Sequence, residues 1–549
     1  MPNSAIPTKD KLYASIRDRH IRVFQVDPAK HLIPNIMPWD PDITDDGFWM
    51  NANDTEKLDD VSALALKFVA ELYPVLNAQR DVPVGFLNLT HGGTPITGWM
   101  PLEDIDRNPA LATRLRELDI YPTQDTWNTK GDLNFQQTSA QYNMRIAPAT
   151  GAKVRGILWY QGENECAGEF TNHVYADYLR AYHEMYRTRF AAFPDNFLML
   201  SSLIYPWTYG KSGECNVGYL NEAFIETAAE SPDKFAYMPI CDLNPMWIHH
   251  QNNHPIHPGR KYEQAERMAK LALSHQYGIP GQTAPARLER FEIVGSRLRL
   301  HFCNVGSGLY IKGLKPRCLY VAGSDGCYLP ADCAVVSPDT LEVWCDEIKS
   351  PIHAAFAIQS LEPMCNLYAG DYPLSPFYTD RVNCLSIEAR PWYDTGVNAV
   401  WGLVEHADAT LDLFYRPVWQ ALAGSTICHD AAFTPDNIPS LRVEGEGSDF
   451  GCSVRAWPYN RLDFQKYAGM SVDLYNADST QASLVLETDD SAVTIPFTDA
   501  QTLPGAWVRR IARFENLPDA EIRRMKFCFS KPEGILKFVN IHRVRLLPR

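Results

Sequence analysis

The chain has 549 residues, which is too long for one hydrophobic core and predicts about three domains of roughly 100–200 residues each. Hydrophobic residues make up 45% and charged residues 21% of the sequence, a balance typical of globular protein rather than of disordered or fibrous chains. The formal net charge of −15 disfavours nucleic acid and anionic membranes as partners, because both repel an acidic surface.

Cysteines and apolar runs bear on localisation. The 13 cysteines are scattered and none forms a C-x-x-C pair, which disfavours a zinc ribbon and suits the reduced thiols of a cytosol. No run of about 18 apolar residues occurs, so we expect no membrane-spanning helix. The first residues are polar and lack the apolar stretch of a signal peptide, and the sequence therefore predicts a cytoplasmic protein.

Residues 1–282 are predicted to form an α/β domain. Short apolar runs alternate with segments whose apolar residues recur at helical spacing, which is typical of a parallel sheet with helices on both faces. Ligands in such folds bind at the carboxyl ends of the strands. The expected strands are 21–26, 82–89, 154–160 and 196–203, and the expected helices are 61–76, 175–190 and 260–275.

Two all-β domains are predicted to follow. The helical spacing disappears beyond Arg287, and short strands alternate with Gly, Pro, Asp and Ser, which predicts a β-sandwich over residues 283–382. Residues 383–549 are again rich in short strands and predict a jelly-roll sandwich. The clearest expected strands are 297–302, 318–321, 340–344 and 353–358 in the first sandwich and 538–547 in the second.

A glycine-rich segment, Thr90–Met100, directly follows the expected strand 82–89. Gly92 and Gly93 permit a tight turn whose backbone N–H groups face outward. Such donors can stabilise the oxyanion that develops during acyl transfer. The alternative is a simple strand-to-helix turn without a catalytic role.

A polar segment, Trp159–Glu165, lies at the end of the expected strand 154–160. Its amide, Gln161, is able to donate an N–H group to an oxyanion. The alternative is an ordinary polar loop in which a carboxylate satisfies nearby donors.

Four histidines lie close together in the segment 249–261. Zinc binding is one interpretation, but the prolines beside the last two histidines exclude the helical i, i+4 ligand geometry, so we predict no metal. His257 is followed by a proline and a predicted helix, which suits a single imidazole acting as general base. The other three, His249, His250 and His254, are expected to lie in a surface loop.

These segments occur in the order and spacing of the sialate O-acetylesterase family of SGNH-type hydrolases, which the chain resembles over roughly residues 20–381. The resemblance rests on VPVGFLNLTHGGTPITGWMP, GILWYQGENE and HPIHPGRK, and on the downstream segments LRLHFCNVGSGLYIKG and CNLYAGDYPLSPFYTD. It implies a flavodoxin-like parallel sheet core, followed here by two β-sandwich domains. It also implies hydrolysis of O-acetyl esters on sialic acid or related sugars, without a cofactor.

The resemblance further implies roles for individual residues. Gly92 or Gly93 and Gln161 supply oxyanion donors, His257 is the general base, and Glu163 orients the loop around Gln161. The expected partner is an O-acetylated sugar or glycan. The last region, 383–549, lies outside the resemblance and is similar to sandwich modules that bind carbohydrate in glycan-processing proteins.

The nucleophile of the family is missing from this sequence. Members carry a Gly-Gln-Ser-Asn segment near the start of the core, and no such segment occurs here. Ser4 is the nearest hydroxyl to the expected position but is displaced by two residues. We therefore leave the nucleophile unassigned and expect a core that is incomplete at its N-terminus.

The chain also departs from the family at the catalytic acid. The family places an acid just before the histidine, where this chain has His254 and Pro255. Asp242 follows another expected strand and either orients His257 or caps a loop.

Three functions are compatible with these segments. The first is an active sugar O-acetylesterase, and the second is a catalytically inactive relative that binds acylated glycans. A glycosidase using Glu163 and Glu165 is the least favoured, because two carboxylates at i and i+2 of one loop need not face one cleft.

Overall fold

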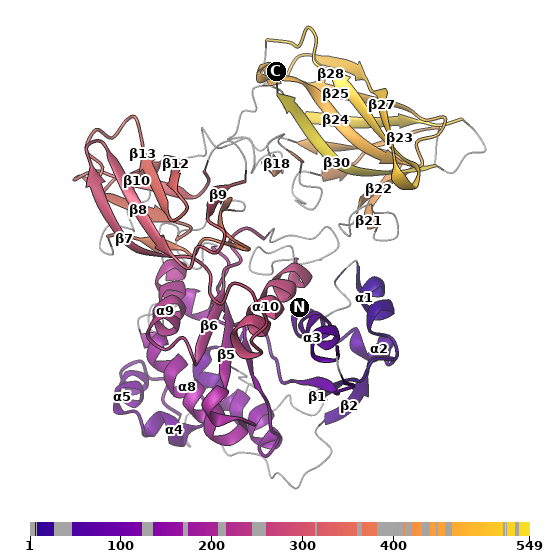
Figure 1. Ribbon diagram of the computed structural model, residues 1–549. Coiled ribbons are helices and arrows are strands. Elements are labelled where there is room, and N and C mark those ends of the chain that lie inside the picture. Colours follow the sequence, from indigo (N-terminus) through magenta and orange to yellow (C-terminus); the bar gives the residue numbers. More distant parts are fainter. Residues whose placement is uncertain are drawn as a thin grey trace.

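In the computed structural model, helices and strands alternate up to Gln276 and strands predominate after it (Figure 1). The described residues are 6, 8–26, 47–78, 80–122, 136–167, 174–206, 216–243, 260–312, 316–358, 365–380, 403–404, 410–411, 419–430, 440–445, 448–455, 464–519, 522, 524–532 and 537–548. Among them, no helix is long and apolar enough to cross a membrane.

The α/β region contains a first sheet of three strands. β1 (Ile21–Val26) pairs in parallel with β3 (Val84–Asn88), as the sequence predicts. β2 (Gly47–Asn51) pairs antiparallel with the other edge of β1 and was not predicted. Its sequence lacks the alternation of a half-buried strand, since neighbouring Phe48 and Trp49 are both exposed.

The second sheet is wholly parallel. β4 (Gly156–Trp159), β5 (Leu198–Ser202) and β6 (Phe235–Met238) are hydrogen-bonded in that order. Within the described residues the two sheets are not hydrogen-bonded to each other, so the predicted single sheet is seen as two groups of three strands. Every residue of β5 is buried, as expected for a strand covered on both faces.

Helices cover both faces of the second sheet (Figure 1). On one face, an aromatic stripe on α8 packs with α9 against Met199 and Leu203. On the other face, α3 and α10 contact Leu198 and Leu200. The helices are α1 (Lys9–Ile16), α2 (Thr55–Leu58), α3 (Ala63–Leu76), α4 (Leu102–Asp106), α5 (Pro109–Glu117), α7 (Glu163–Ala167), α8 (Tyr175–Phe190), α9 (Asn216–Glu230) and α10 (Lys261–Gln276).

The middle of the chain forms a β-sandwich around one apolar core. One sheet has the order β11-β10-β14-β17, the facing sheet has the order β12-β13-β8-β7, and a small third sheet has the order β16-β15-β9. The strands are β7 (Arg287–Val294), β8 (Arg297–Cys303), β9 (Leu309–Ile311), β10 (Leu319–Ala322), β11 (Tyr328–Pro330), β12 (Asp332–Ser337), β13 (Thr340–Trp344), β14 (His353–Phe356), β15 (Leu367–Ala369), β16 (Tyr372–Pro373) and β17 (Phe377–Tyr378).

Contacts between buried groups join this sandwich to the α/β region. The Cys365 N–H group donates a 2.9 Å hydrogen bond to the Cys241 carbonyl, which lies just after β6. The hydroxyl groups of Tyr237 and Ser375 are 2.8 Å apart and buried.

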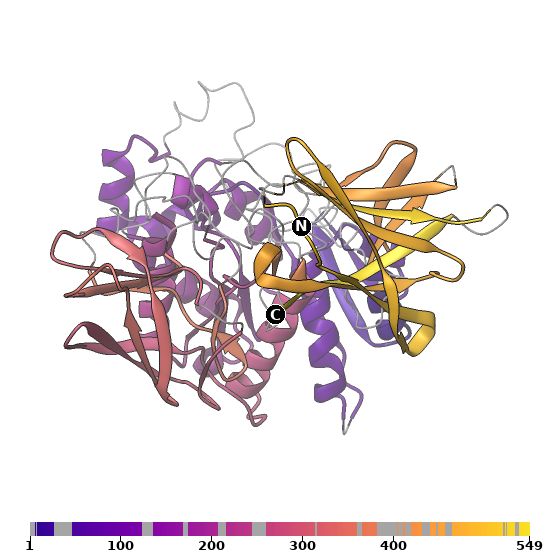
Figure 2. The same ribbon diagram turned by 90° about the horizontal axis from the view of Figure 1, so that it is seen from above.

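The C-terminal part is a second antiparallel sandwich with its own core. A sheet containing β24, β28 and β30 faces a sheet of order β20-β23-β29-β25-β26. Figures 1 and 2 both place the two sandwiches on opposite sides of the molecule. The strands are β18 (Leu403–Val404), β19 (Thr410–Leu411), β20 (Trp419–Ala421), β21 (Ser425–Asp430), β22 (Ser440–Gly445), β23 (Asp449–Arg455), β24 (Tyr467–Tyr475), β25 (Gln481–Glu487), β26 (Ala492–Pro496), β27 (Thr498–Leu503), β28 (Trp507–Arg513), β29 (Arg524–Ser530) and β30 (Phe538–Pro548).

The domain boundaries at 282 and 382 stay predictions. The second of them lies outside the described residues, which resume at Leu403.

Candidate active site

The Gly92–Gly93 turn follows the carboxyl end of β3, as the sequence predicts. Gly93 has a φ of +72°, a conformation that favours glycine because it has no Cβ. Both glycines are exposed, and a Cβ added at Gly92 would meet nothing within 4 Å. Among the described residues, neither glycine N–H donates a hydrogen bond.

Gln161 is buried just after β4 and all of its amide hydrogen bonds are made within the protein. Its Nε2 group donates to the Thr94 carbonyl at 2.8 Å and to the Glu165 carboxylate at 2.5 Å. Its Oε1 atom accepts from the Tyr175 hydroxyl at 2.8 Å. An oxyanion would have to displace one of the two acceptors before it could bind this amide.

Glu165 is the carboxylate that holds Gln161, although Glu163 was expected to orient this loop. Its side chain is 1% exposed and lies on α7. Besides Gln161, it accepts a 2.7 Å hydrogen bond from the Ile96 N–H group. Burial raises the pKa of Glu165 to about 7, against the lowering effect of the donors Ile96 and Gln161. The sequence suggested Glu165 only as a glycosidase carboxylate, because one of its partners, the Ile96 N–H group, is 69 residues away in the chain.

Glu163 lies near a buried cation instead. Burial raises the pKa of Glu163, and the charge of Lys261 on α10 opposes that rise. Burial also lowers the pKa of Lys261 to about 7, with Glu163 acting in the other direction. The Lys261 Nζ atom lies 4.0 Å from the centre of the Tyr160 ring, a cation–π contact.

Asp242, the candidate catalytic acid, is bonded on both oxygens. The Arg267 guanidinium donates to Oδ1 at 2.7 Å and to Oδ2 at 2.5 Å, and the Tyr368 hydroxyl donates to Oδ2 at 2.6 Å. Burial opposes ionisation, but Arg267 outweighs it and holds the pKa of Asp242 below its ordinary value. These contacts join the α/β region to β15 of the middle sandwich.

A buried arginine beside the glycine turn was not anticipated. Arg145 is 4% exposed, and its guanidinium lies 2.9 Å from Nδ1 of His91. Burial and the Arg145 charge lower the pKa of His91, which therefore stays neutral at pH 7. The two residues are 54 positions apart, so no local pattern links them.

The remaining predicted site residues are His257 and Ser4, and both lie outside the described residues. The expected convergence of Gln161 and His257 is therefore still a prediction. In the part of the chain that the structure describes, no cluster of three or more His, Cys, Asp or Glu side chains is arranged to hold a metal ion.

The segment that contains the Gly92–Gly93 turn and the Gln161–Glu165 loop indicates the class of protein. Residues 37–194 match the family described as "Carbohydrate esterase, sialic acid-specific acetylesterase". The family that the sequence motifs resemble is thereby confirmed over this segment. No curated protein matches the chain.

Solved structures that match parts of this chain differ in how far their folds agree with it. A carbohydrate acetylesterase from Xanthomonas citri is 22% identical, with a TM-score of 0.55 over 69% of this chain and 78% of that chain. A CBM22-1 xylan-binding domain from Paenibacillus barcinonensis is 11% identical, with a TM-score of 0.20 over 24% of this chain and 88% of that domain. A family 11 carbohydrate-binding module from Clostridium thermocellum is 13% identical, with a TM-score of 0.19 over 25% of this chain and 94% of the module. The last two scores are too low to support an inference.

Proposed function

We propose that this chain hydrolyses O-acetyl esters on sialic acid or a related sugar by serine-type acyl transfer. The observation that carries the proposal is the contact between the Gly92–Gly93 turn and the Gln161–Glu165 loop. Asn164 donates to the Gly93 carbonyl at 3.2 Å, and Gln161 donates to the Thr94 carbonyl at 2.8 Å. Both loops lie within the segment matched by the sialic acid-specific acetylesterase family.

The proposed chemistry assigns one role to each group. A serine hydroxyl attacks the acetyl carbonyl carbon while His257 accepts the hydroxyl proton. The carbonyl oxygen becomes negatively charged and is stabilised by the N–H groups of Gly92 or Gly93. His257 then protonates the departing sugar oxygen, and water releases acetate from the acyl-enzyme. Ser4 is the candidate nucleophile within this chain.

Hydrolysis of p-nitrophenyl acetate and of O-acetylated sialic acid by the purified chain tests this function. We expect acetate release together with labelling of one serine by a fluorophosphonate probe. Labelling that disappears in Ser4→Ala would identify the nucleophile. An absence of acetate release from both substrates would overturn the proposal.

His257→Ala tests the general base. We expect kcat to fall by several orders of magnitude, on the order of 10⁴–10⁶, because no other group would accept the serine proton. The matched control is His249→Ala, which removes a neighbouring histidine with no proposed role and should retain activity. If the two variants keep equal activity, His257 is not the base.

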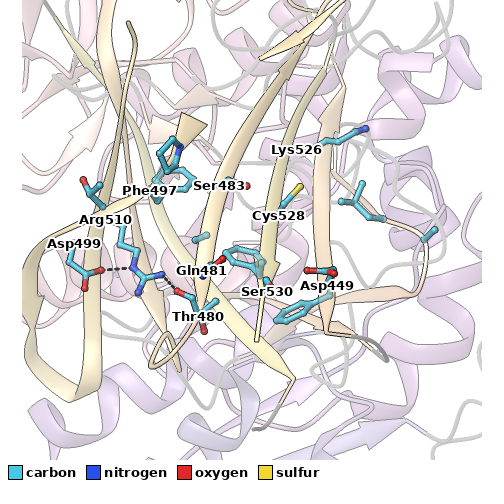
Figure 3. A pocket seen from close by; sticks show the side chains of 17 residues that line it. Asp449, Thr480, Gln481, Ser483, Phe497, Asp499, Arg510, Lys526, Cys528 and Ser530 are labelled. Atoms are coloured by element: carbon cyan, nitrogen blue, oxygen red, sulfur yellow. Dashed lines mark hydrogen bonds and ion pairs between the residues drawn. The ribbon is translucent and has the colours of Figure 1, made fainter. Parts of the chain in front are cut away.

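A second candidate function is binding of acylated glycans without hydrolysis. The C-terminal sandwich contains a cavity of about 900 Å³ between its strands (Figure 3). Its lining combines apolar side chains such as Phe497 with polar side chains, which is the mixture that sugars require. Arg510 is held there by Asp499 at 2.6 Å and by the Thr480 carbonyl at 2.7 Å. Gln481, Ser483 and Ser530 are further polar residues of this lining (Figure 3).

Calorimetry with O-acetylated sialosides separates the two candidates. A glycan binder should bind without releasing acetate, and Gln481→Ala should weaken that binding. An esterase should release acetate at a rate that Gln481→Ala leaves unchanged.

A further inference from the structure

Three side chains of the segment 161–165 hold the backbone of the turn at residues 93–96. Asn164 donates to the Gly93 carbonyl, Gln161 donates to the Thr94 carbonyl, and Glu165 accepts from the Ile96 N–H group. Glu165 also accepts from Gln161, so it joins both ends of this set of contacts. We call Gln161, Asn164 and Glu165 the clamp.

The clamp fixes the three peptide groups between Gly93 and Ile96, directly after the two glycines. The Gly93 carbonyl accepts from Asn164 at 3.2 Å and from Gln136 at 2.7 Å, and the exposed residues Gly92 and Gly93 belong to the same turn. Gln161 is itself fixed by Tyr175, whose hydroxyl lies 2.8 Å from Oε1 and accepts from Trp159 Nε1 at 3.1 Å. The backbone directly after the two glycines therefore depends on side chains that lie far from it in sequence.

The clamp needs an ionised Glu165. Each of its two oxygens faces an N–H donor, Ile96 at 2.7 Å and Gln161 at 2.5 Å. A carboxylate accepts at both oxygens, whereas a protonated carboxyl group places a hydrogen against one of the donors. Gln161 has no free N–H group to rearrange, because its second N–H donates to Thr94.

We propose that Glu165 is a positioning residue that orients the Gly92–Gly93 oxyanion turn through Gln161, and that it acts only as the carboxylate. This inference rests on the proposed esterase function, and it gives Gln161 a positioning role in place of direct donation to the oxyanion.

Because this role depends on the charge of Glu165, it predicts how stability and activity change with pH. Burial, the largest effect, raises its pKa to about 7 and Glu163 raises it further, while Ile96 and Gln161 lower it. The other titratable groups facing it are Cys166 on its own helix and Tyr175 and Tyr178 on α8, and burial raises the pKa of all three, so they stay neutral near pH 7.

Stability and activity are then expected to respond to pH with opposite signs. The folded pKa of Glu165 is raised above its ordinary 4.5, so the folded state holds this proton more tightly than the unfolded state. The contribution of Glu165 to stability is therefore present at low pH and is lost as pH rises from about 4.5 to about 7. Ester hydrolysis, in contrast, should gain as the carboxylate forms.

Glu165→Gln is the central variant, because it keeps the shape of the side chain but places an NH₂ group against one of the two donors. We expect kcat for p-nitrophenyl acetate at pH 8 to fall about 10–100-fold with KM changed less than about twofold, as for misplaced oxyanion donors. The difference in Tm, variant minus unmodified chain, should increase as the pH is raised from 4.5 to 7. Glu165→Asp keeps the charge and should recover part of kcat.

Asp473→Asn is the matched control, since Asp473 is a buried carboxylate in the C-terminal sandwich whose two oxygens bind Arg509 at 2.6 and 2.9 Å. It should lower Tm while leaving kcat unchanged. A kcat loss in Glu165→Gln no larger than in this control would overturn the inference.

Hydrogen exchange of the peptide 89–100 tests the clamp without an activity assay. Protection of the Ile96 amide, corrected for intrinsic exchange, should be lost in Glu165→Gln at pH 8 and should weaken in the unmodified chain at pH 6. Unchanged protection would refute the clamp. Loss of protection in a chain that hydrolyses no acetyl ester would support the clamp and overturn the proposed function.

Discussion

Asp242 shows how a single carboxylate can look catalytic in sequence and yet be engaged in holding parts of the fold together. Its oxygens are bonded to Arg267 on α10 and to Tyr368 in the middle sandwich. A buried carboxylate with three donors is already satisfied, and its lowered pKa reflects a stable ion pair. The described contacts therefore favour a joining role over orientation of His257.

Asp242→Asn distinguishes the two roles. Removing the charge leaves Arg267 without its partner, so we expect a loss of about 3–5 kcal/mol in the free energy of unfolding by urea at pH 7. Asp177→Asn, which breaks an exposed ion pair with Arg180, is the control and should cost less than about 1 kcal/mol. A variant that keeps its stability but loses esterase activity would instead make Asp242 the catalytic partner.

The same ion pair should respond to acid. Because the folded pKa of Asp242 is held below its ordinary value of 3.8, its stabilising contribution is present above that value and is lost as pH falls through the folded pKa. The difference in unfolding free energy between the unmodified chain and Asp242→Asn should shrink in that acidic range. A difference that is constant with pH would contradict the assignment.

At the level of elements, the helix α9 contacts the middle sandwich at a glycine. A Cβ at Gly218 would lie 2.9 Å from Cβ and 3.0 Å from the carbonyl oxygen of Ile358, closer than side chains normally approach. The neighbouring Tyr219 ring packs against Tyr378, whose hydroxyl bonds to Glu222 of the same helix. This glycine allows the helix to approach the strand end.

Gly218→Ala should destabilise the chain although alanine favours helix by about 1 kcal/mol. The close contact with the Ile358 backbone must be relieved by a shift of α9, and we expect a net loss of about 1–3 kcal/mol in urea unfolding. Thr188→Ala on the exposed face of α8 is the control, because the Thr188 hydroxyl bonds to carbonyl groups of its own helix, those of Glu184 and Met185. A more stable Gly218→Ala would show that the helix and the sandwich are not closely packed.

At the level of the whole molecule, the core of the C-terminal sandwich is separate from the other apolar clusters. Its members all lie between Trp419 and Leu546, and they include the fully buried Leu484. We expect this part to unfold as a unit of its own.

Leu484→Ala tests that independence. We expect a loss of about 2–5 kcal/mol in the stability of the C-terminal sandwich, from lost burial and a cavity. Acetyl ester hydrolysis at temperatures below the transition should be unchanged. Calorimetry should show the unfolding transition of the C-terminal sandwich at a lower temperature and another transition at an unchanged temperature. If activity were lost together with the shifted transition, this separation would be contradicted.

Much of the architecture was determined by sequence patterns that act locally. Apolar runs predicted β1, β3, β4 and β5, and helical spacing predicted α3, α8 and α10, because burial periodicity is set by the geometry of each element. The short strands of both sandwiches were likewise predicted from their turn residues. The family that the motifs resemble was confirmed over residues 37–194, where the motifs are contiguous runs of sequence.

Tertiary structure decided what each polar side chain contacts. Glu165 rather than the expected Glu163 binds Gln161, and Asp242, whose role the sequence left open, binds Arg267. The antiparallel strand β2 also depends on its partner, since it forms against the open edge of β1 without an alternating pattern of its own. Burial and long-range hydrogen bonds fix these outcomes, and both depend on residues that the chain brings together only when it folds.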